Sequence, residues 1–491
     1  MRLPLCEPGY LGRSPNLDAS RLINFYPELS PKTSKGPIAL IGTPGLTLQT
    51  SSGTAIVQGM HVFNGLLYVV SGGLLYSLST AMMVSSALGQ LTTPIGRVLM
   101  SDNGLASAGV GGNQLMMTDG VNGYIYNVST NNFSTISGGG WPGNPIALTY
   151  IDGYFVTAQA GSMTGYASNL YDGTTWNALA QSPVSAVPDF IQGVCNLQEQ
   201  LWFIKQFSSE CWYNTGTATS VGFPFARQTN AVFDFGTPAP ASISRGANGI
   251  FFLCSPREND RGGMLGAAHI GGQTFTPEQI CPPNIAYLWS QYGFVADAFG
   301  YCYTDGGHEF WVLTFPSANA TWCYDSTTKY WHERSTWTGS PYATGRHASN
   351  CYAYFNNMHL VGDYESGNIY QMSGGVYQDV NAQGQAIPLV STRVFQPLFD
   401  EKGLNNIFFK KFQLDMETGV GNGNTPNPQA ALSWSDDGGH TWSSDYLASI
   451  GAQGQYQARA MWWRLGCSRS RTFRVSISDP VKRILIGAYV E

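Results

Sequence analysis

Charged side chains are scarce in this sequence. Asp, Glu, Lys and Arg make up 11% of the 491 residues, less than half the share of about 25% that is usual for a soluble domain. Glycine, with 58 residues, and aromatic residues, at 13%, are abundant instead. This composition favours short strands joined by tight turns over amphipathic helices. A surface so poor in charge is expected where much of it lies in interfaces.

Long apolar runs are also missing. No stretch of the sequence reaches the length of about 20 apolar residues that a helix needs to cross a bilayer. Residues 1–7 lack the apolar core of a signal peptide. We therefore expect no membrane partner, and we expect the protein to be made and held in the cytoplasm until it is assembled.

Motifs for metals and for catalysis are absent as well. The nine cysteines show no C-x-x-C spacing and the seven histidines no metal spacing. Buried, reduced thiols are expected, although Cys195 with Cys211, and Cys302 with Cys323, could form disulfides on neighbouring strands. No phosphate-binding loop, nucleophile elbow or zinc-protease motif occurs. The sequence predicts no cofactor, no metal site and no enzymatic activity.

One pattern recurs seven times in the middle of the chain: a turn, an apolar strand, a loop, and a second strand that ends in an aromatic residue. The closing residues are about 42 to 56 positions apart. Such periods, with several short strands each, are typical of β-propeller blades, which bury their faces against one another around an axis. We predict a seven-bladed propeller, with six blades as the alternative. The copies begin at Asn64, Gly112, Asp152, Gln200, Asn248, Glu309 and Asn357.

The last hundred residues lose this period. Phe412, Leu414 and Met416 alternate with polar neighbours, which indicates a strand with one apolar face. About five such strands predict a small β-sandwich. The fold class is therefore all-β. We predict three parts: an N-terminal arm that joins the sandwich or a neighbouring subunit (1–45), the propeller (46–384) and the sandwich (385–491).

Charge is distributed unevenly along the chain. Residues 46–384 contain 9 basic and 19 acidic side chains, whereas residues 385–491 contain 11 basic and 9 acidic ones. A cluster of arginines near the C-terminus could dock on an acidic partner. It could equally form a solvated or internally paired strand face, and nucleic-acid readout is a third alternative.

Residues 435–442 match the Asp-box pattern S-x-D-x-G-x-T-W, in which the aspartate holds backbone N–H groups and the tryptophan packs beneath the turn. We predict a structural turn made by Ser435, Asp437, Gly439, Thr441 and Trp442.

Asp-boxes also occur in sialidases, so a carbohydrate-binding or sialidase-like propeller is the alternative function. Such an enzyme needs three clustered arginines, and no spacing selects three from the propeller region. Its arginines are Arg97, Arg227, Arg245, Arg257, Arg261, Arg334 and Arg346.

Segments near both ends of the chain resemble one protein family. The segments Arg21-Leu22-Ile23-Asn24-Phe25-Tyr26-Pro27-Glu28 and Gly42-Thr43-Pro44-Gly45-Leu46 look like the opening of podovirus tail hub or tail nozzle proteins, the packaged-DNA stabilisation family. The segments Trp463-Arg464-Leu465-Gly466 and Arg471-Thr472-Phe473-Arg474 are similar to the final strands of those proteins.

This resemblance implies a virion protein without a catalytic site. It implies a ring, expected to be a homohexamer, below the portal and its adaptor ring. The ring would extend the DNA channel without reading DNA sequence, retain packaged DNA, and carry the tail needle and the fibres or spikes. We predict that the two terminal segments form the face that docks on the adaptor ring. The docking residues would be Arg21, Tyr26, Glu28, Arg464, Arg469, Arg471 and Arg474.

Overall fold

The fold consists almost entirely of β-strands. Among the described residues, the only α-helix is α1 (Pro283–Ser290), and two single turns of 3₁₀-helix are η1 (Ala106–Ala108) and η2 (Pro240–Ser242). The computed structural model describes residues 1–6, 12–31, 33–109, 111–255, 265–271, 276–340, 342–402 and 405–491.

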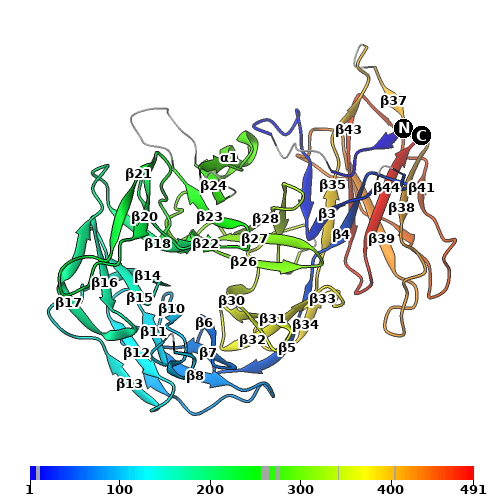
Figure 1. The fold of residues 1–491 in the computed structure, drawn as a ribbon. Coiled ribbons are helices and arrows are strands. Elements are labelled where there is room, and N and C mark those ends of the chain that lie inside the picture. Colours follow the sequence, from blue (N-terminus) through cyan, green and yellow to red (C-terminus); the bar gives the residue numbers. More distant parts are fainter. Residues whose placement is uncertain are drawn as a thin grey trace.

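Seven blades of four antiparallel strands form a closed ring (Figure 1); six are separate sheets, and the other is continuous with a sheet of the C-terminal part. The first strands of neighbouring sheets contact one another all the way round, so they line the axis and the later strands lie outward. Each of the seven sequence copies falls on the second and third strands of one blade. The predictions of a β-propeller and of seven blades are confirmed.

The first four blades follow one another without interruption. They consist of β6 (Val57–Phe63), β7 (Leu66–Ser71), β8 (Leu74–Leu78) and β9 (Gly89–Gln90); β10 (Leu99–Asp102), β11 (Gln114–Thr118), β12 (Gly123–Asn127) and β13 (Asn132–Thr135); β14 (Pro145–Ile151), β15 (Tyr154–Gln159), β16 (Thr164–Asn169) and β17 (Asp172–Pro183); and β18 (Ile191–Leu197), β19 (Gln200–Lys205), β20 (Ser209–Asn214) and β21 (Phe225–Phe233).

The last three blades complete the ring. They consist of β22 (Ser244–Arg245), β23 (Gly249–Cys254), β24 (Gly266–Gly271) and β25 (Pro277–Gln279); β26 (Phe299–Asp305), β27 (His308–Phe315), β28 (Ala320–Asp325) and β29 (Tyr330–Arg334); and β30 (Ser349–Phe355), β31 (Met358–Asp363), β32 (Asn368–Ser373) and β5 (Gly45–Ser51).

The second strand of each blade explains why the apolar pattern is continuous rather than alternating. Every residue of β11, β23 and β27 is buried, because each blade has a neighbour on both faces. The clusters of buried side chains accordingly bridge adjacent blades: one joins Tyr68 and Val70 to Leu115 and Met117. Burial at about 25 cal/mol per Å² of apolar surface makes these contacts the main stabilisation of the ring.

Closure of the ring depends on a strand from the beginning of the chain. Strand β5 pairs with β32, opposing Leu46 to Met372 and Leu48 to Tyr370. Blade seven therefore combines three strands from the end of the propeller with one that precedes blade one. This pairing leaves no open sheet edge at the junction between the first and last blades.

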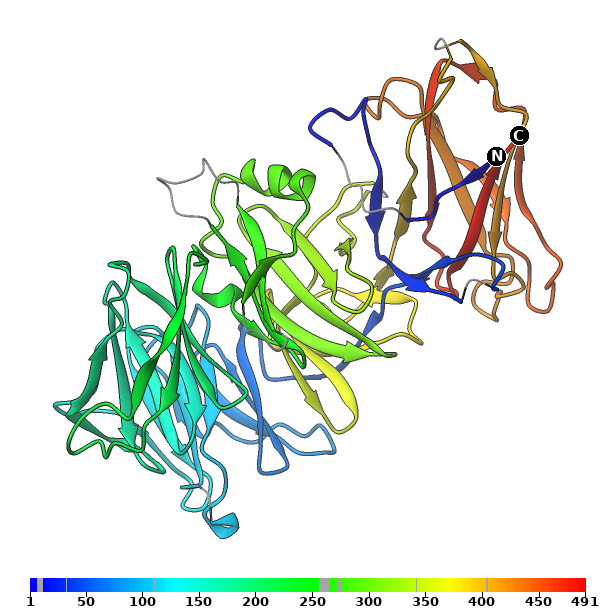
Figure 2. The ribbon, with the colours of Figure 1, turned by 45° about the horizontal axis from the view of Figure 1, so that its top comes forward.

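A β-sandwich lies beside blade six (Figures 1 and 2). Its core contains Phe412, Leu414 and Met416 facing Phe473 and Val475, as their alternation predicts. One sheet has β1 (Arg2–Leu3), β3 (Phe25–Leu29), β4 (Ile38–Gly42), β38 (Lys411–Met416), β41 (Ala460–Trp463) and β44 (Ile484–Val490). The other has β2 (Arg21–Ile23), β35 (Ser391–Val394), β36 (Leu398–Phe399), β39 (Gln429–Ser435), β40 (Tyr446–Ser449) and β43 (Ser470–Ile477).

The N-terminal arm supplies four of these sandwich strands, β1 to β4. Strand β2 also pairs in parallel with β29 of blade six, at Ile23 and Glu333. The second sandwich sheet is thus continuous with a propeller blade. Because backbone hydrogen bonds cross the junction, the two parts are held together by more than side-chain contact.

The linker between propeller and sandwich is a hairpin of β33 (Gln378–Val380) and β34 (Ala386–Pro388). The buried Arg483 of the sandwich fastens it, because one terminal nitrogen donates to the Tyr377 and Asp479 carbonyl oxygens, at 2.6 and 3.0 Å. The other terminal nitrogen donates to the Leu389 carbonyl oxygen and the Ser391 hydroxyl. One guanidinium therefore ties both ends of the linker to the sandwich.

Cys195, Cys211, Cys302 and Cys323 are free thiols. The alternative of disulfides between Cys195 and Cys211, or Cys302 and Cys323, is therefore wrong. Burial raises the pKa of the Cys195 and Cys323 thiols to about 12, so these residues pack as small apolar side chains. Within the described part of the chain, no helix is both long and apolar enough to cross a membrane.

Candidate functional site

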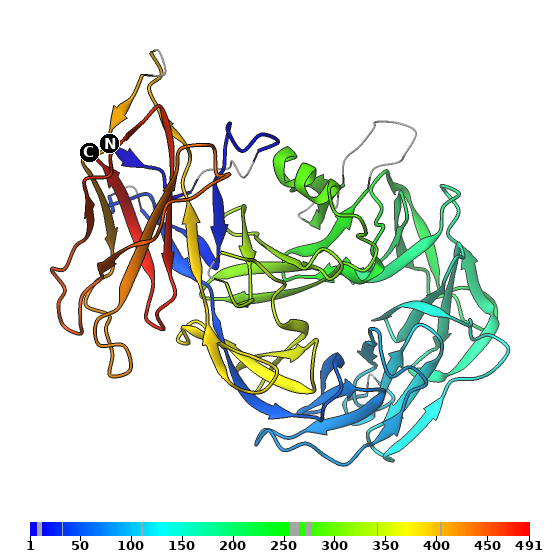
Figure 3. The same ribbon diagram turned by 180° about the vertical axis from the view of Figure 1, so that it is seen from behind.

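The outer end of the sandwich carries the side chains most suited to contact with another protein. We call it the sandwich tip, consisting of β36, the short antiparallel pair of β37 (Ile407–Phe408) and β42 (Cys467–Ser468), and residues 463–469. β37 opposes Phe408 to Cys467. In Figures 1 and 3 the β37 end lies at the margin of the molecule, beside both chain termini.

Three aromatic side chains at the tip face solvent. Phe408 is 74% exposed, Trp463 58% and Phe399 47%. Large aromatic residues are enriched at protein interfaces, where they supply most of the binding energy. An exposed group of them on a chain with a well-packed core indicates a contact surface rather than a folding requirement. The sequence analysis missed these three residues because a short strand such as Ile407–Phe408 has no readable period.

Two of the predicted docking arginines lie beside these rings. Arg464 and Arg469 are exposed, and neither has an ion-pair partner among the described residues. The backbone of Arg464 has a φ of 60°, and its side chain is exposed to solvent. Both guanidinium groups are available for bidentate contacts with carboxylates.

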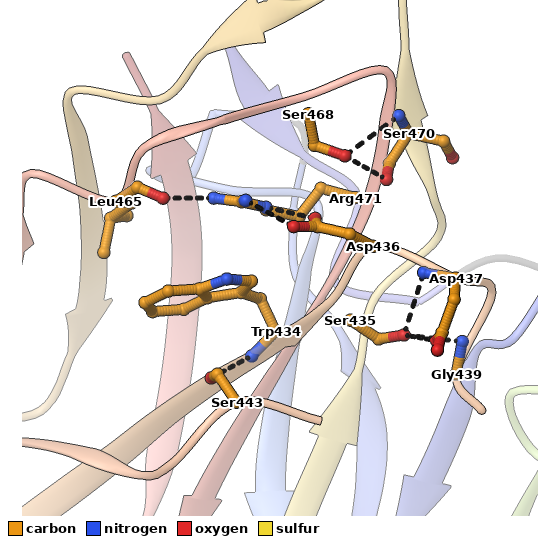
Figure 4. A network of polar contacts seen from close by, with 10 residues as sticks. All are labelled: Trp434, Ser435, Asp436, Asp437, Gly439, Ser443, Leu465, Ser468, Ser470 and Arg471. Atoms are coloured by element: carbon orange, nitrogen blue, oxygen red, sulfur yellow. Dashed lines mark hydrogen bonds and ion pairs between the residues drawn. The ribbon is translucent and has the colours of Figure 1, made fainter. Parts of the chain in front are cut away.

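Arg471 is used inside the chain (Figure 4). Its Nε and one terminal nitrogen donate to the two carboxylate oxygens of Asp436, at 2.6 and 2.7 Å. Its other terminal nitrogen donates to the Leu465 carbonyl oxygen. The side chain is only 3% exposed and lies 5.1 Å from the centre of the Trp434 ring. Arg471 therefore holds the turn that presents Arg464, and it is not itself a surface residue.

Arg474 is also internal. Its guanidinium carbon lies 3.4 Å from the centre of the Tyr342 ring and 4.0 Å from that of Trp442. Its Nε donates to the Ser433 hydroxyl at 3.0 Å. For Arg471 and Arg474, the internally paired strand face is thus the arrangement found, and direct docking by these two side chains does not fit the structure.

The residues of the N-terminal arm lie at the junction with the propeller. Arg21 forms a bidentate ion pair with Glu333 of blade six, at 2.6 and 2.9 Å. Tyr26 packs edge-on against His308 and Phe310, each 5.2 Å away, and burial raises the pKa of its hydroxyl to about 12. Of the three predicted arm residues, only Glu28 is exposed. The structure does not bring these residues together with Arg464 and Arg469.

The turn at residues 435–442 has the hydrogen bonds of an Asp-box. The Asp437 carboxylate accepts the Thr441 N–H at 2.9 Å and the Thr441 hydroxyl at 2.6 Å. Those bonds and the Ser435 hydroxyl hold the pKa of Asp437 well below its usual range. Gly439 donates to the Ser435 hydroxyl and accepts from the Trp442 indole at 3.1 Å. The turn positions Trp442 against Arg474.

A similar turn was missed in the propeller. In the segment Ser168 to Trp176, the Asp172 carboxylate accepts the Thr174 N–H at 2.9 Å, and the Trp176 indole donates to the Gly173 carbonyl oxygen at 2.7 Å. The signal is present in the sequence as D-G-T-T-W, with a spacing shorter than that of the Asp-box pattern.

The propeller arginines do not form a cluster of three in the described residues. Arg97 and Arg346 meet at Asn350, whose side-chain oxygen accepts from them at 3.0 and 3.5 Å. Arg334 is buried elsewhere, against Tyr303, and Arg245 binds Asn196. Arg257 and Arg261 lie outside the described residues. The described part of the chain also has no group of three His, Cys, Asp or Glu side chains able to hold a metal ion.

The separate roles of neighbouring arginines lead to a stability prediction. Arg471→Met should lower the free energy of unfolding by about 2–3 kcal/mol, because the Leu465 carbonyl and the Asp436 carboxylate lose their donor. Arg469→Met should change it by less than about 0.5 kcal/mol, since that side chain is exposed. Urea unfolding of both variants measures the difference. Equal stabilities for the two variants would contradict the internal role of Arg471.

Comparison with known proteins agrees with this architecture. The family model described as bacteriophage P22 Gp10, beta-propeller, matches residues 1–377, and that described as bacteriophage P22 Gp10, beta-sandwich, matches residues 393–491. No curated protein sequence matches the chain.

Solved structures similar to the chain include the Neurospora crassa Pan2 WD40 domain, with 9% identity, a TM-score of 0.40, and coverage of 67% of this chain and 94% of that one. Another is the N-terminal domain of Nup159, with 10% identity, a TM-score of 0.39, and coverage of 70% and 98%. The two family models together span nearly the whole chain, propeller and sandwich in the observed order. The chain belongs to the bacteriophage P22 Gp10 family and is a structural component of a phage tail.

Proposed function

We propose that this protein forms the hub, or nozzle, of a short tail: a closed ring of six copies that continues the DNA channel below the portal and its adaptor ring. The ring retains the packaged genome and carries the tail needle and the fibres or spikes. It assembles in the host cytoplasm and catalyses no reaction. The observation that carries the docking part of this proposal is the sandwich tip, where exposed aromatic rings and unpaired arginines lie together.

The chemistry of the tip fits a partner ring with acidic and apolar residues at its rim. Aromatic anchors contribute affinity, and arginines beside them steer assembly and set register. Every subunit of a ring presents the same residues, so one tip per subunit gives a repeated contact. Arg464 and Arg469 carry this role, together with Phe399, Phe408 and Trp463. Arg21, Tyr26, Arg471 and Arg474 contribute by positioning the sandwich.

The charge of the propeller segment suits a surface that DNA passes without binding. Residues 46–384 have ten more acidic than basic side chains. A wall with excess negative charge repels phosphate groups, so DNA slides past without a sequence-specific contact.

Native mass spectrometry tests the ring. The purified chain, alone or with its adaptor ring, should give a species of six times the 53.2 kDa subunit mass. A chain that stays monomeric in both conditions and binds or cleaves host glycans would contradict the hub and favour a carbohydrate-binding or sialidase-like propeller.

A further inference from the structure

A cavity of about 420 Å³ lies where the arm, the propeller and the sandwich meet. Its walls come from the arm around Ile23, from the segment after blade six, from β35, and from the Asp-box turn. Its volume is within the range of about 300–1,000 Å³ that is typical of ligand pockets. None of the residues of the sandwich tip lines it.

The chemistry of the cavity centres on Arg474. The side chain is 93% buried, with 7% exposed, and lines the cavity. The centres of the Tyr342 and Trp442 rings lie 3.4 and 4.0 Å from its guanidinium carbon. Its Nε donates to the Ser433 hydroxyl. Stacking on an aromatic ring uses a face of a guanidinium, whereas its N–H groups donate in the plane.

The N–H edge of the guanidinium has no direct ion pair: no carboxylate among the described residues lies within ion-pair distance of Arg474. Asp445, whose charge acts on Arg474 from further away, accepts the Tyr342 hydroxyl. The other arginine of the cavity, Arg21, is committed to Glu333. A buried guanidinium without a directly bound counter-ion is costly, whereas a carboxylate offers two oxygens that match its paired donors.

One part of the wall is apolar. Ala19, Ile23, Val390, Val394 and Trp337 contribute to it, and such a surface suits short aliphatic side chains. Backbone groups of the loop formed by residues 342–344 lie at the rim, where Ala343 and Thr344 are exposed.

We propose that this cavity binds an acidic peptide segment of another protein, with an Asp or Glu carboxylate on the edge of Arg474 and flanking apolar side chains against the aliphatic wall. The site belongs to the folded monomer. Its binding can therefore be measured on the isolated chain, and a failure here leaves the hub proposal untouched.

Selection from a displayed library of random heptapeptides tests the proposal. Peptides retained by the wild-type chain should share an Asp or Glu residue next to aliphatic residues. Changing that acid to its amide, or Arg474 to Gln, should weaken binding about tenfold to a hundredfold, the effect of losing a charge-assisted pair of hydrogen bonds.

A second variant tests the cavity without changing Arg474, in case the Arg474→Gln chain misfolds. Ala343→Trp fills the cavity from its exposed rim and should abolish retention while leaving the melting temperature near that of the wild type. Ala87→Trp, at an exposed position in blade one, is the matched control and should bind as the wild type does. Selection of no peptides, selection of peptides without an acid, or full retention by Ala343→Trp overturns the proposal.

Discussion

Particles assembled with Phe408→Ser, Trp463→Ser and Arg464→Gln in this protein should lose the joint between the tail and the head-side ring. Central aromatic and arginine residues cost about 2 kcal/mol or more each when removed from an interface, and the tips of all subunits lose them together. We expect the titre of infectious particles to fall by at least about a hundredfold. Plaque assays of a complemented mutant, with electron microscopy to count tailless heads, measure the effect.

A matched control tests whether the defect comes from the sandwich tip or from the loss of any exposed aromatic side chains. Phe294 and Tyr354 are 55% and 53% exposed on the propeller, similar to Trp463. Their replacement by Ser should leave the titre within about threefold of the wild type, because surface substitutions outside an interface are nearly neutral. Tails that join normally in the tip variant, or an equal defect in the control, would remove the sandwich tip from the docking surface.

The propeller was predictable because its pattern is local and repeated. Each blade puts one strand between two neighbours, so a continuous apolar run ending in an aromatic residue recurs at every copy. Turn signals such as Asn64-Gly65, with φ of 49° and 72°, mark the hairpins. The pairing that closes the ring was not predictable: nothing in Gly45–Ser51 shows that it pairs with Asn368–Ser373, more than 300 residues away.

The docking residues were only partly predictable, for a reason visible in β43. Phe473, Val475 and Ile477 do alternate with Arg474 and Ser476, and that alternation correctly gives the core face. The opposite face is buried too, because Tyr342 from the propeller and Trp442 from the Asp-box turn cover it. Periodicity tells which side chains share a face, but a distant segment decides whether that face meets solvent.

The junction between the two parts should depend on one residue. Arg483→Met should lower the free energy of unfolding by about 3–5 kcal/mol, since it leaves the carbonyl groups of Tyr377, Leu389 and Asp479 without their donor in a buried site. The linker hairpin should also loosen. Limited proteolysis should then cut within residues 378–388 faster than in the wild type, while the sandwich and the propeller each stay resistant.

Replacing Asp379, in the same hairpin, should have the opposite effect on stability. Burial raises the pKa of its carboxyl to about 7, above the value of about 3.9 in an unfolded chain. The folded state therefore holds more protons between these values, and the stability of the wild type falls as the pH rises from about 4 to 7. Asp379→Asn should remove this loss, so its advantage over the wild type should grow across that range and then level off. If Arg483→Met unfolds and is cleaved like the wild type, Arg483 does not hold the linker. If Asp379→Asn shows no gain in stability with rising pH, the Asp379 carboxyl does not have a raised pKa.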